Sequence, residues 1–452
     1  MSKRVPAPSG KALYRVLHNR ARGMTPEQIA FHQRSRLQGA MVAAVAANGY
    51  ADTTIKQLVS LAGVSRRTFY ELFADKQACF LSTYDLIAAM ATKRISRAYR
   101  AREDWRERLR GGFECFAEIV CEERAASHLV LVDALGVGHR VLEHRERMAE
   151  HFELMLRQSF QDAPQGAVVS DTLVRAIVAG IRRVAYRRLL AGEPEQLSAL
   201  MDDLLDWALG YHAPGVTAPV RAPGVAPIAE HDGIPRLHET LAKSTIAPLD
   251  TALARATLTH RERILHAVVS LASEGGYGAL SIPAISARAG TSNQTFYEIF
   301  TDKQDAFLAA FDEATQRAIE PTARAFQAAP TWPAAVHAAI ETLLEHAVSD
   351  HVFARMAFFE ILTGGAAATE RAEQSLDTFA TMLTPGYAEH PHVPAVVGEA
   401  IIGGIWNVIQ HEVAHGRAAQ LPELAAELTY LALTPFLGAQ EAARIAAGQA
   451  AG

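Results

Sequence analysis

The chain contains a long internal repeat. Shifting its 452 residues by 227 positions aligns residues 49–80 with residues 276–307 without a gap. Fifteen of these 32 positions are identical, as are 11 of the 16 positions in 62–77. Farther along, the offset becomes 224 and pairs Gly180 with Gly404. A repeat length of about 225 residues excludes a solenoid of short units and predicts that the same domain arrangement occurs twice in the chain.

A segment rich in proline and glycine separates the two repeats. It has no apolar period, which predicts an interdomain linker over residues 213–250, with a short helix near 237–243. Within each repeat, apolar residues recur at helical spacing, as Leu37, Met41 and Val45 do. No run alternates between apolar and polar residues, so the sequence predicts an all-α chain.

Composition excludes several classes of protein. With 49% hydrophobic and 21% charged residues, the chain is not expected to be disordered. No 18-residue apolar stretch predicts a membrane span, and the basic N-terminus lacks the apolar region of a signal peptide. Three cysteines, Cys79, Cys115 and Cys121, are too few for a disulfide framework, so we expect a reducing cytoplasm.

Charge is unevenly distributed along the chain. The whole carries a net charge of −5, but residues 1–100 hold 16 Lys/Arg and 5 Asp/Glu, a net charge of +11. Residues 251–310, in the second repeat, hold five of each. A basic end on an acidic protein indicates local contact with a polyanion. The basic arm at 1–31 could follow a phosphate backbone or form a solvated tail.

Residues 54–73 carry a helix-turn-helix pattern. Thr54 and Gln57 have the spacing of a capping box at the start of a short helix. Gly63 supplies the left-handed turn that ends this helix, and Ser65 can cap the helix that follows. Two short helices joined by a glycine turn are typical of a helix-turn-helix motif.

The second helix of such a motif enters the DNA major groove, where its N-terminal residues contact bases. Arginine suits guanine because its parallel N–H groups match O6 and N7, and hydroxyls and lysine suit phosphate oxygens. The sequence therefore predicts double-stranded DNA as a partner, while Phe69 and Phe73 are expected in the core. The predicted DNA-contacting residues of the first repeat are Thr54, Ser65, Arg66, Arg67, Thr68, Tyr70 and Lys76.

The pattern A-G-V-S-x-x-T-F-Y-x-x-F-x-D-K at Ala62–Lys76 resembles the DNA-binding domain of the tetracycline-repressor (TetR) family, and it recurs with Thr291 in place of valine at Ala289–Lys303. The resemblance implies two DNA-binding domains, head 1 (32–80) and head 2 (251–307), each followed by a helical regulatory domain (81–212 and 308–446). It also implies that Thr68, Tyr70 and Lys76 contact phosphates, with Ser65, Arg66 and Arg67 nearer the bases. The matching residues of head 2 are Ser292, Asn293, Gln294, Thr295, Tyr297 and Lys303.

Proteins of this family normally act as homodimers, so the resemblance implies an intramolecular pseudo-dimer, in which helices near 171–210 pair with helices near 398–436. The chain would then be a monomer or form a further dimer. The two recognition helices would lie roughly 34 Å, or a multiple of one DNA turn, apart. The expected function is a ligand-responsive repressor that binds an asymmetric operator. In the alternative, head 1 alone binds DNA and the second repeat serves as a dimerisation partner.

The regulatory domains are expected to hold a small apolar ligand between helices. Two other functions stay open, a protein that binds only other proteins and a zinc hydrolase. The hydrolase would use the H-E-x-x-H pattern at 411–415, with His411 and His415 as ligands and Glu412 as base, although coincidence is the favoured explanation. No cofactor, bound metal or catalytic residue is predicted. The candidate pocket residues are Phe113, Phe116, His128, Asp133 and His139 in the first repeat, and Phe353, Met356, Phe359 and Glu360 in the second.

Overall fold

The computed structural model describes residues 24–138, 140–164, 169–212 and 258–448, together with 216 and 219. In these ranges every element is helical, as predicted, and no helix is long and apolar enough to cross a membrane. Most of the arm, nearly all of the linker with its predicted helix at 237–243, and His139 lie outside the described residues. The described residues form two compact units: unit 1 lies within Met1–Ala163 and Ile181–Asp206, and unit 2 within Pro164–Gly180 and Trp207–Gly452.

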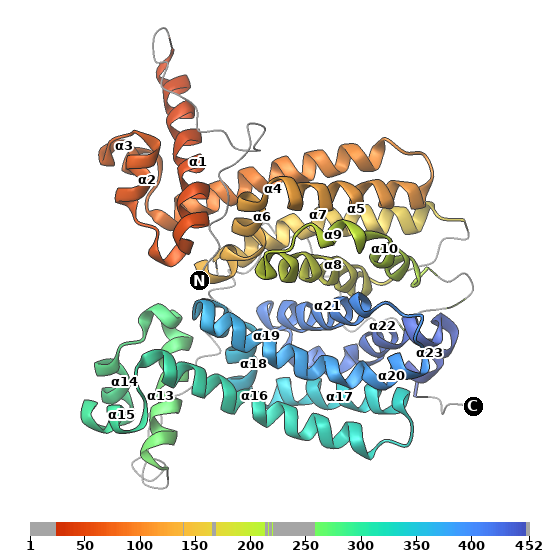
Figure 1. Cartoon of the computed structure of the whole chain (residues 1–452). Coiled ribbons are helices and arrows are strands. Elements are labelled where there is room, and N and C mark those ends of the chain that lie inside the picture. Colours follow the sequence, from red (N-terminus) through yellow and green to blue (C-terminus); the bar gives the residue numbers. More distant parts are fainter. Residues whose placement is uncertain are drawn as a thin grey trace. The chain divides into compact units, whose positions relative to one another are not determined.

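Head 1 is a bundle of three helices (Figure 1), α1 (Pro26–Asp52), α2 (Ile55–Ala62) and α3 (Arg66–Leu72). A capping box at Thr25 starts α1 inside the range expected for the arm. The predicted capping box between Thr54 and Gln57 is present at the start of α2. Gly63 ends α2 with a φ of 59°, the left-handed conformation that glycine adopts without strain.

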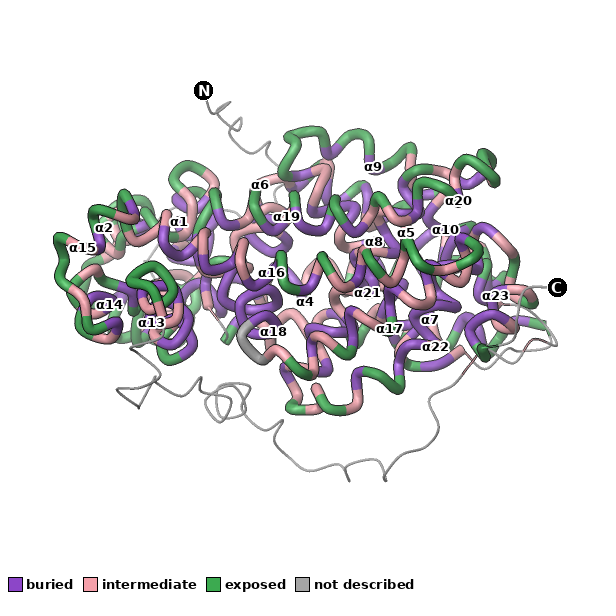
Figure 2. Tube along the Cα trace, turned by 90° about the horizontal axis from the view of Figure 1, so that it is seen from below, coloured by how far each residue is buried: buried purple, intermediate pink, exposed green. Residues whose placement is uncertain are grey.

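The body of unit 1 is a helical bundle. It contains α4 (Lys76–Arg100), α5 (Trp105–Glu122), α6 (Arg124–Leu131), η1 (Asp133–Val137), α7 (Arg140–Asp162), α9 (Gln196–Ala199) and parts of α8 (Asp171–Ala191) and α10 (Met201–Leu209). Ile95, Cys115 and Ile119 form a buried cluster in this body, against which Phe116 and Phe152 pack. Buried residues follow one face of many helices (Figure 2), as expected for amphipathic helices around a core.

Unit 2 contains head 2 and its own helical body. Head 2 comprises α13 (His260–Gly275), η2 (Tyr277–Ala279), α14 (Ile282–Ala289) and α15 (Asn293–Ile299). The body comprises α16 (Lys303–Ala328), α17 (Trp332–Ser349), α18 (His351–Phe358), η3 (Glu360–Thr363), α19 (Ala366–Ala380), η4 (Thr381–Leu383), α20 (Thr384–Glu389), α21 (Ala395–Ala414), η5 (Ala418–Leu424), α22 (Ala425–Leu437) and α23 (Ala439–Ala446). The first ten residues of α8 and the end of α10, which belong to the first repeat in sequence, also lie in unit 2.

The same tertiary contacts recur at the offset of 227. The Gln77 side-chain amide donates to the carbonyl of Val137 at 3.0 Å, and Gln304 donates to Gly364 at 3.4 Å. Each bond joins the helix after a head to the 3₁₀ region of its body. Asp85 contacts His144 at 2.5 Å, and the matching Asp312 contacts Arg371 at 3.3 Å. Both repeats therefore fold alike well beyond the helix-turn-helix motif.

Candidate nucleic-acid interface

The exposed surface of α3 presents the side chains predicted to contact bases. Ser65 caps this helix, because its hydroxyl accepts a hydrogen bond from the Thr68 backbone N–H at 2.9 Å, and its oxygen lies 2.8 Å from the Thr68 hydroxyl. Phe69, which is fully buried, and Phe73 hold the helix on the core, as predicted. Arg66 and Arg67 follow the cap directly and are exposed. The helix is thus fixed from one side and open to a ligand on the other.

The two arginines of α3 have different local partners. The Arg66 guanidinium carbon lies 5.7 Å from the centre of the Tyr70 ring, and its Nη2 lies 3.5 Å from the Tyr70 hydroxyl. Arg67 donates to Glu71 at 2.9 Å in an exposed ion pair. Such a pair contributes only about 0.3–0.5 kcal/mol on a helix surface. A nucleic acid can therefore displace Glu71 from Arg67 at little cost.

Head 2 repeats this geometry with different side chains. Ser292 caps α15 by accepting from the Thr295 backbone N–H at 3.0 Å, and Phe296 is fully buried. Gln294 donates to Glu298 at 3.2 Å, in the place of the Arg67–Glu71 pair. Asn293 is exposed, and so is Tyr297 at 59%. Uncharged amides therefore stand where head 1 has two cations.

Comparison with known proteins identifies these heads. The model of the bacterial regulatory proteins of the tetR family matches the chain twice, at residues 40–83 and at residues 264–310. The chain belongs to the TetR family. It carries the DNA-binding domain of that family twice and is a DNA-binding transcriptional regulator.

Two solved structures of regulators match part of this chain. The fatty acid degradation regulator FadR from Bacillus halodurans is 17% identical, with a TM-score of 0.36, over 40% of this chain and 98% of that protein. The transcriptional regulator FadR from Bacillus subtilis, solved in complex with stearoyl-CoA, is 15% identical, with a TM-score of 0.36, over 39% and 97%. No curated protein matches the chain.

Lys76 of head 1 has a structural function, whereas the resemblance implies a phosphate contact for it. Its ammonium donates to the carbonyls of Tyr50 at 2.9 Å, Ala51 at 3.3 Å and Thr53 at 2.9 Å. It also lies 4.2 Å from the centre of the Tyr50 ring, and burial lowers its pKa. Lys303 of head 2 has the same position, donating to Leu280 at 3.1 Å. Both lysines thus hold the segment before the helix-turn-helix against the next helix.

The start of α2 carries Thr54, which was predicted to contact DNA, and Lys56, which was not. The Thr54 hydroxyl accepts from the Gln57 backbone N–H at 3.3 Å and lies 2.9 Å from the Gln57 side-chain oxygen, so it is occupied by the cap. Lys56, which is exposed beside it, has no local ion pair in the described part of the chain. The signal was present, since a cation at the start of a helix-turn-helix can contact phosphate. Pro283 occupies this position in head 2.

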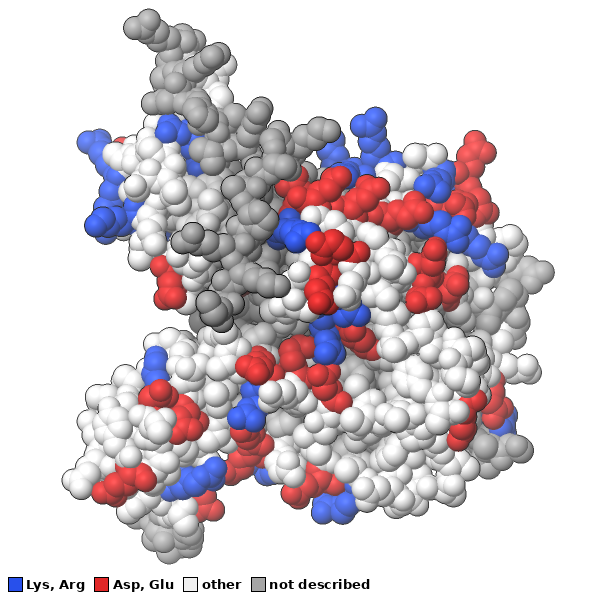
Figure 3. Space-filling model, in the orientation of Figure 1, with Lys and Arg blue, Asp and Glu red and all other residues white. Residues whose placement is uncertain are grey.

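Head 1 is less basic than the net charge of +11 over residues 1–100 indicates. Residues 24–80 hold six Lys/Arg and four Asp/Glu, a net charge of +2. Residues 1–23 add six cations without an acid, and residues 81–100 add four cations and one acid. Lys and Arg gather over the α2–α3 end of head 1, whereas both signs mix over head 2 (Figure 3). Part of the basic excess therefore lies on α4, beyond the DNA-binding head.

The helical body of unit 2 contains an apolar cavity of about 60 Å³ among α16, α17, α19, α21 and α22. Its lining includes Ile340, Leu343, Phe379, Ile402 and Trp406. The predicted pocket residues Phe353, Met356, Phe359 and Glu360 are all buried, in or just after α18, and do not line this cavity.

The predicted pocket residues of the first repeat lie in the body of unit 1. Phe113 and Phe116 are half-buried on α5. His128, near the end of α6, contacts Asp133 at 2.7 Å. Asp133 begins η1, so this pair joins two consecutive elements of the body.

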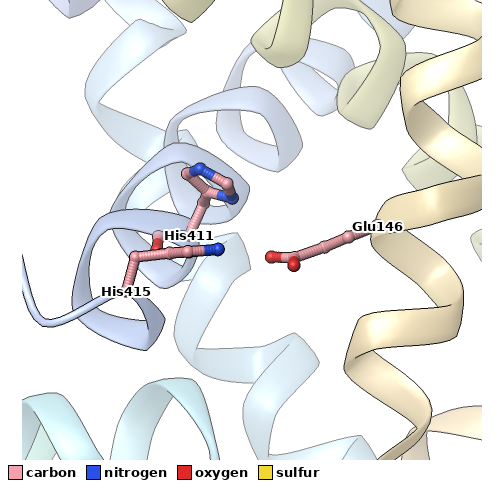
Figure 4. A group of neighbouring side chains, drawn as sticks. All are labelled: Glu146, His411 and His415. Atoms are coloured by element: carbon pink, nitrogen blue, oxygen red, sulfur yellow. The ribbon is translucent and has the colours of Figure 1, made fainter. Parts of the chain in front are cut away.

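His411 and His415 lie on successive turns at the end of α21, with ring centres 4.1 Å apart (Figure 4). Glu146, also drawn there, is a residue of α7 in unit 1. Glu412 is buried, and its carboxylate accepts two hydrogen bonds from Arg417, each at 2.8 Å. A general base must reach the proton that it removes. The carboxylate of Glu412 is instead buried and bonded to Arg417, which argues against the zinc-hydrolase hypothesis.

Proposed function

We propose that this TetR-family regulator is a ligand-responsive repressor whose two unequal heads bind an asymmetric operator. The observation that carries the proposal is the pair of exposed, capped recognition helices with different side chains at matched positions. Arg66 and Arg67 suit guanine O6 and N7, whereas Asn293 and Gln294 suit adenine N6 and N7. The half-site under head 1 should therefore be richer in guanine.

An intramolecular pseudo-dimer is supported by contacts inside unit 2 between segments of the two repeats. A Cβ added to Gly180 of α8 would lie 2.5 Å from the carbonyl oxygen of Ala400 in α21. The matching Gly404 of α21 has the reciprocal relation to the Ala176 oxygen of α8, at 2.7 Å. Tyr211 donates to the carbonyl of Leu431 at 2.8 Å. Reciprocal close contacts of this kind are what a two-fold interface requires.

The alternative in which only head 1 binds DNA also has support. Residues 281–303 of head 2 hold two cations and two acids, whereas residues 54–76 of head 1 hold four cations and two acids. Electrostatic attraction to phosphates supplies most of the non-specific affinity for DNA. Head 2 would then contribute little affinity of its own.

Ligand response is supported by a chain of contacts from the apolar cavity to head 2. Trp406 lines the cavity and packs on Phe358, with ring centres 4.2 Å apart. Phe358 ends α18, which also carries Arg355. Arg355 pairs with Glu360 at 3.0 Å and donates to the carbonyl of Ser273 in α13. A small apolar ligand that enlarges the cavity would displace Trp406 and, through α18, the first helix of head 2.

In vitro selection of bound DNA by the full chain tests the proposal. We expect an asymmetric site whose guanine-rich half is lost with the R66A/R67A variant and whose other half is lost with N293A/Q294A. Each lost bidentate contact should lower affinity about 5- to 150-fold, because such contacts contribute about 1–3 kcal/mol. If N293A/Q294A changes nothing, head 1 acts alone. A perfect palindrome with equal half-sites would refute the asymmetric operator.

A further inference from the structure

A basic groove of about 950 Å³ runs between α4 and α7 in unit 1. Lys93, Arg97 and Arg100 line it from α4, and Arg147 lines it from α7. The only acidic residue in the lining is Asp85, which contacts His144 of α7 at 2.5 Å. Lys93, Arg97 and Arg100 are three of the four cations that α4 carries beyond head 1.

The groove cations are not neutralised by carboxylates. None of the four lining cations has an ion pair among the residues that the structure describes. Arg94, adjacent to Lys93 on α4, behaves differently, because it pairs with Glu118 at 3.1 Å and with Glu122 at 2.8 Å. Glu118 and Glu122 thus pair with a cation of α4 that lies outside the groove lining, and the groove keeps its positive charge.

Two further cations lie near the groove. Arg145 of α7 and Arg182 of α8 are half-buried, and neither has a described carboxylate within ion-pair distance. Burial and the neighbouring Arg182 lower the pKa of Arg145 to about 10, and burial also lowers the pKa of Arg182, while Glu146 opposes both shifts. Both are near enough to Tyr84 to affect its pKa, and the Tyr84 hydroxyl donates to the sulfur of Met148 in the groove lining at 3.8 Å.

The second repeat provides an internal comparison, because only one of the four matched positions keeps a cation. Lys93, Arg97, Arg100 and Arg147 correspond to Glu320, Arg324, Gln327 and Gln374 at the offset of 227. Arg145 corresponds to Ala372, and at the offset of 224 Arg182 corresponds to Trp406, which lines the apolar cavity. The four cations that line the groove in the first repeat are thus reduced to one, Arg324, in the second.

We propose that the groove between α4 and α7 binds a small organic polyanion, a phosphorylated metabolite with two or more negative charges. Arginine and lysine without carboxylate partners favour phosphate oxygens, which accept charge-assisted hydrogen bonds. The volume matches the upper range of small-molecule sites, about 300–1,000 Å³, and exceeds what an inorganic ion needs. The groove begins nine residues into α4, about 14 Å along the helix, so it is displaced from the base-contacting end of head 1.

Titration calorimetry of the full chain without DNA tests the site, with ATP as the organic polyphosphate probe. Because no DNA is present, the result does not depend on the proposed operator. We expect ATP to bind at one site per chain, and R97Q/R147Q to weaken it about tenfold or more. The matched control R94Q removes a cation from the same helix but outside the groove, and should bind ATP like the wild type. Thermal unfolding of each variant establishes that it is folded.

Three results of the ATP experiment would overturn the proposal, and one DNA titration would do so as well. One is the absence of ATP binding to the folded wild type at millimolar concentration. Another is an equal loss of ATP affinity in R94Q and R97Q/R147Q, which would indicate general surface charge. The third is inorganic phosphate binding as tightly as ATP. A DNA titration distinguishes the other source of phosphate: if R97Q/R147Q lowers DNA affinity and its salt dependence while R94Q does not, the groove contacts the DNA backbone instead.

Discussion

Adding a methyl group at Gly180 or Gly404 tests whether α8 and α21 pack as closely as the structure shows. The Gly404→Ala Cβ would lie 2.7 Å from the oxygen and 3.2 Å from the carbon of the Ala176 carbonyl. The Gly180→Ala Cβ would lie 2.5 Å from the Ala400 oxygen and 2.7 Å from the Trp207 ring. An ordinary contact begins near 3.4 Å, so the helices must separate by several tenths of an ångström. A backbone carbonyl cannot rotate away as a side chain can.

Two opposing free energies decide the outcome. Replacing glycine by alanine inside a helix stabilises it by about 1 kcal/mol. Forcing extra volume into a packed interface costs about 1–3 kcal/mol. We therefore expect each single variant to lower the free energy of unfolding by up to about 2 kcal/mol. The double variant should cost less than the sum, because the first methyl group has already separated the helices.

Urea unfolding of the full chain, followed by circular dichroism, measures these changes. Gly112→Ala is the matched control, since this glycine is also inside a helix but its added Cβ would meet only side-chain atoms at 3.8 and 3.9 Å. The control should be as stable as the wild type or more stable. If Gly180→Ala and Gly404→Ala both stabilise the protein like the control, the close approach of α8 and α21 is wrong.

Three further substitutions follow from individual contacts. Thr54→Ala should destabilise head 1 by about 1 kcal/mol, because the N-cap of α2 is lost; an unchanged melting curve would exclude this role for the cap. Burial raises the pKa of Glu360 to about 7 from 4.5, so folding favours its protonated form, and the contribution of Glu360 to stability should be fully present below pH 4.5 and be lost as the pH rises to about 7. Glu360→Gln should flatten this dependence of the unfolding midpoint on pH, and an unaltered slope would contradict the assignment. Lys76→Met should destabilise head 1 without changing how DNA affinity varies with salt, because the ammonium is bonded to three carbonyls; a salt slope reduced by about one unit would show that Lys76 contacts a phosphate.

Local features of the heads could be predicted from the sequence. The capping box at Thr54, the left-handed Gly63 and the buried Phe69 and Phe73 all occur as expected. Their conformations depend on neighbours within a few residues, since a cap, a glycine turn and an amphipathic pattern are short-range properties. The repeat also predicted two such heads, because residues with the same local conformational preferences occur at matched positions in both repeats. The capping box at Thr25 was not predicted, and it starts α1 before residue 32, where head 1 was expected to begin.

Properties that depend on distant residues were decided only by the tertiary structure. The sequence shows Lys76 as a cation after the recognition helix, but the fold brings its ammonium to the carbonyls of Tyr50 and Thr53. Likewise, no pattern along the chain indicates that Arg97 and Arg147 line one groove, or that Gly180 meets Ala400. These pairs are separated by 23 to 220 residues. Sequence determined which segments form capped helices, and the packing of those helices determined which charges remain without partners and where backbones touch.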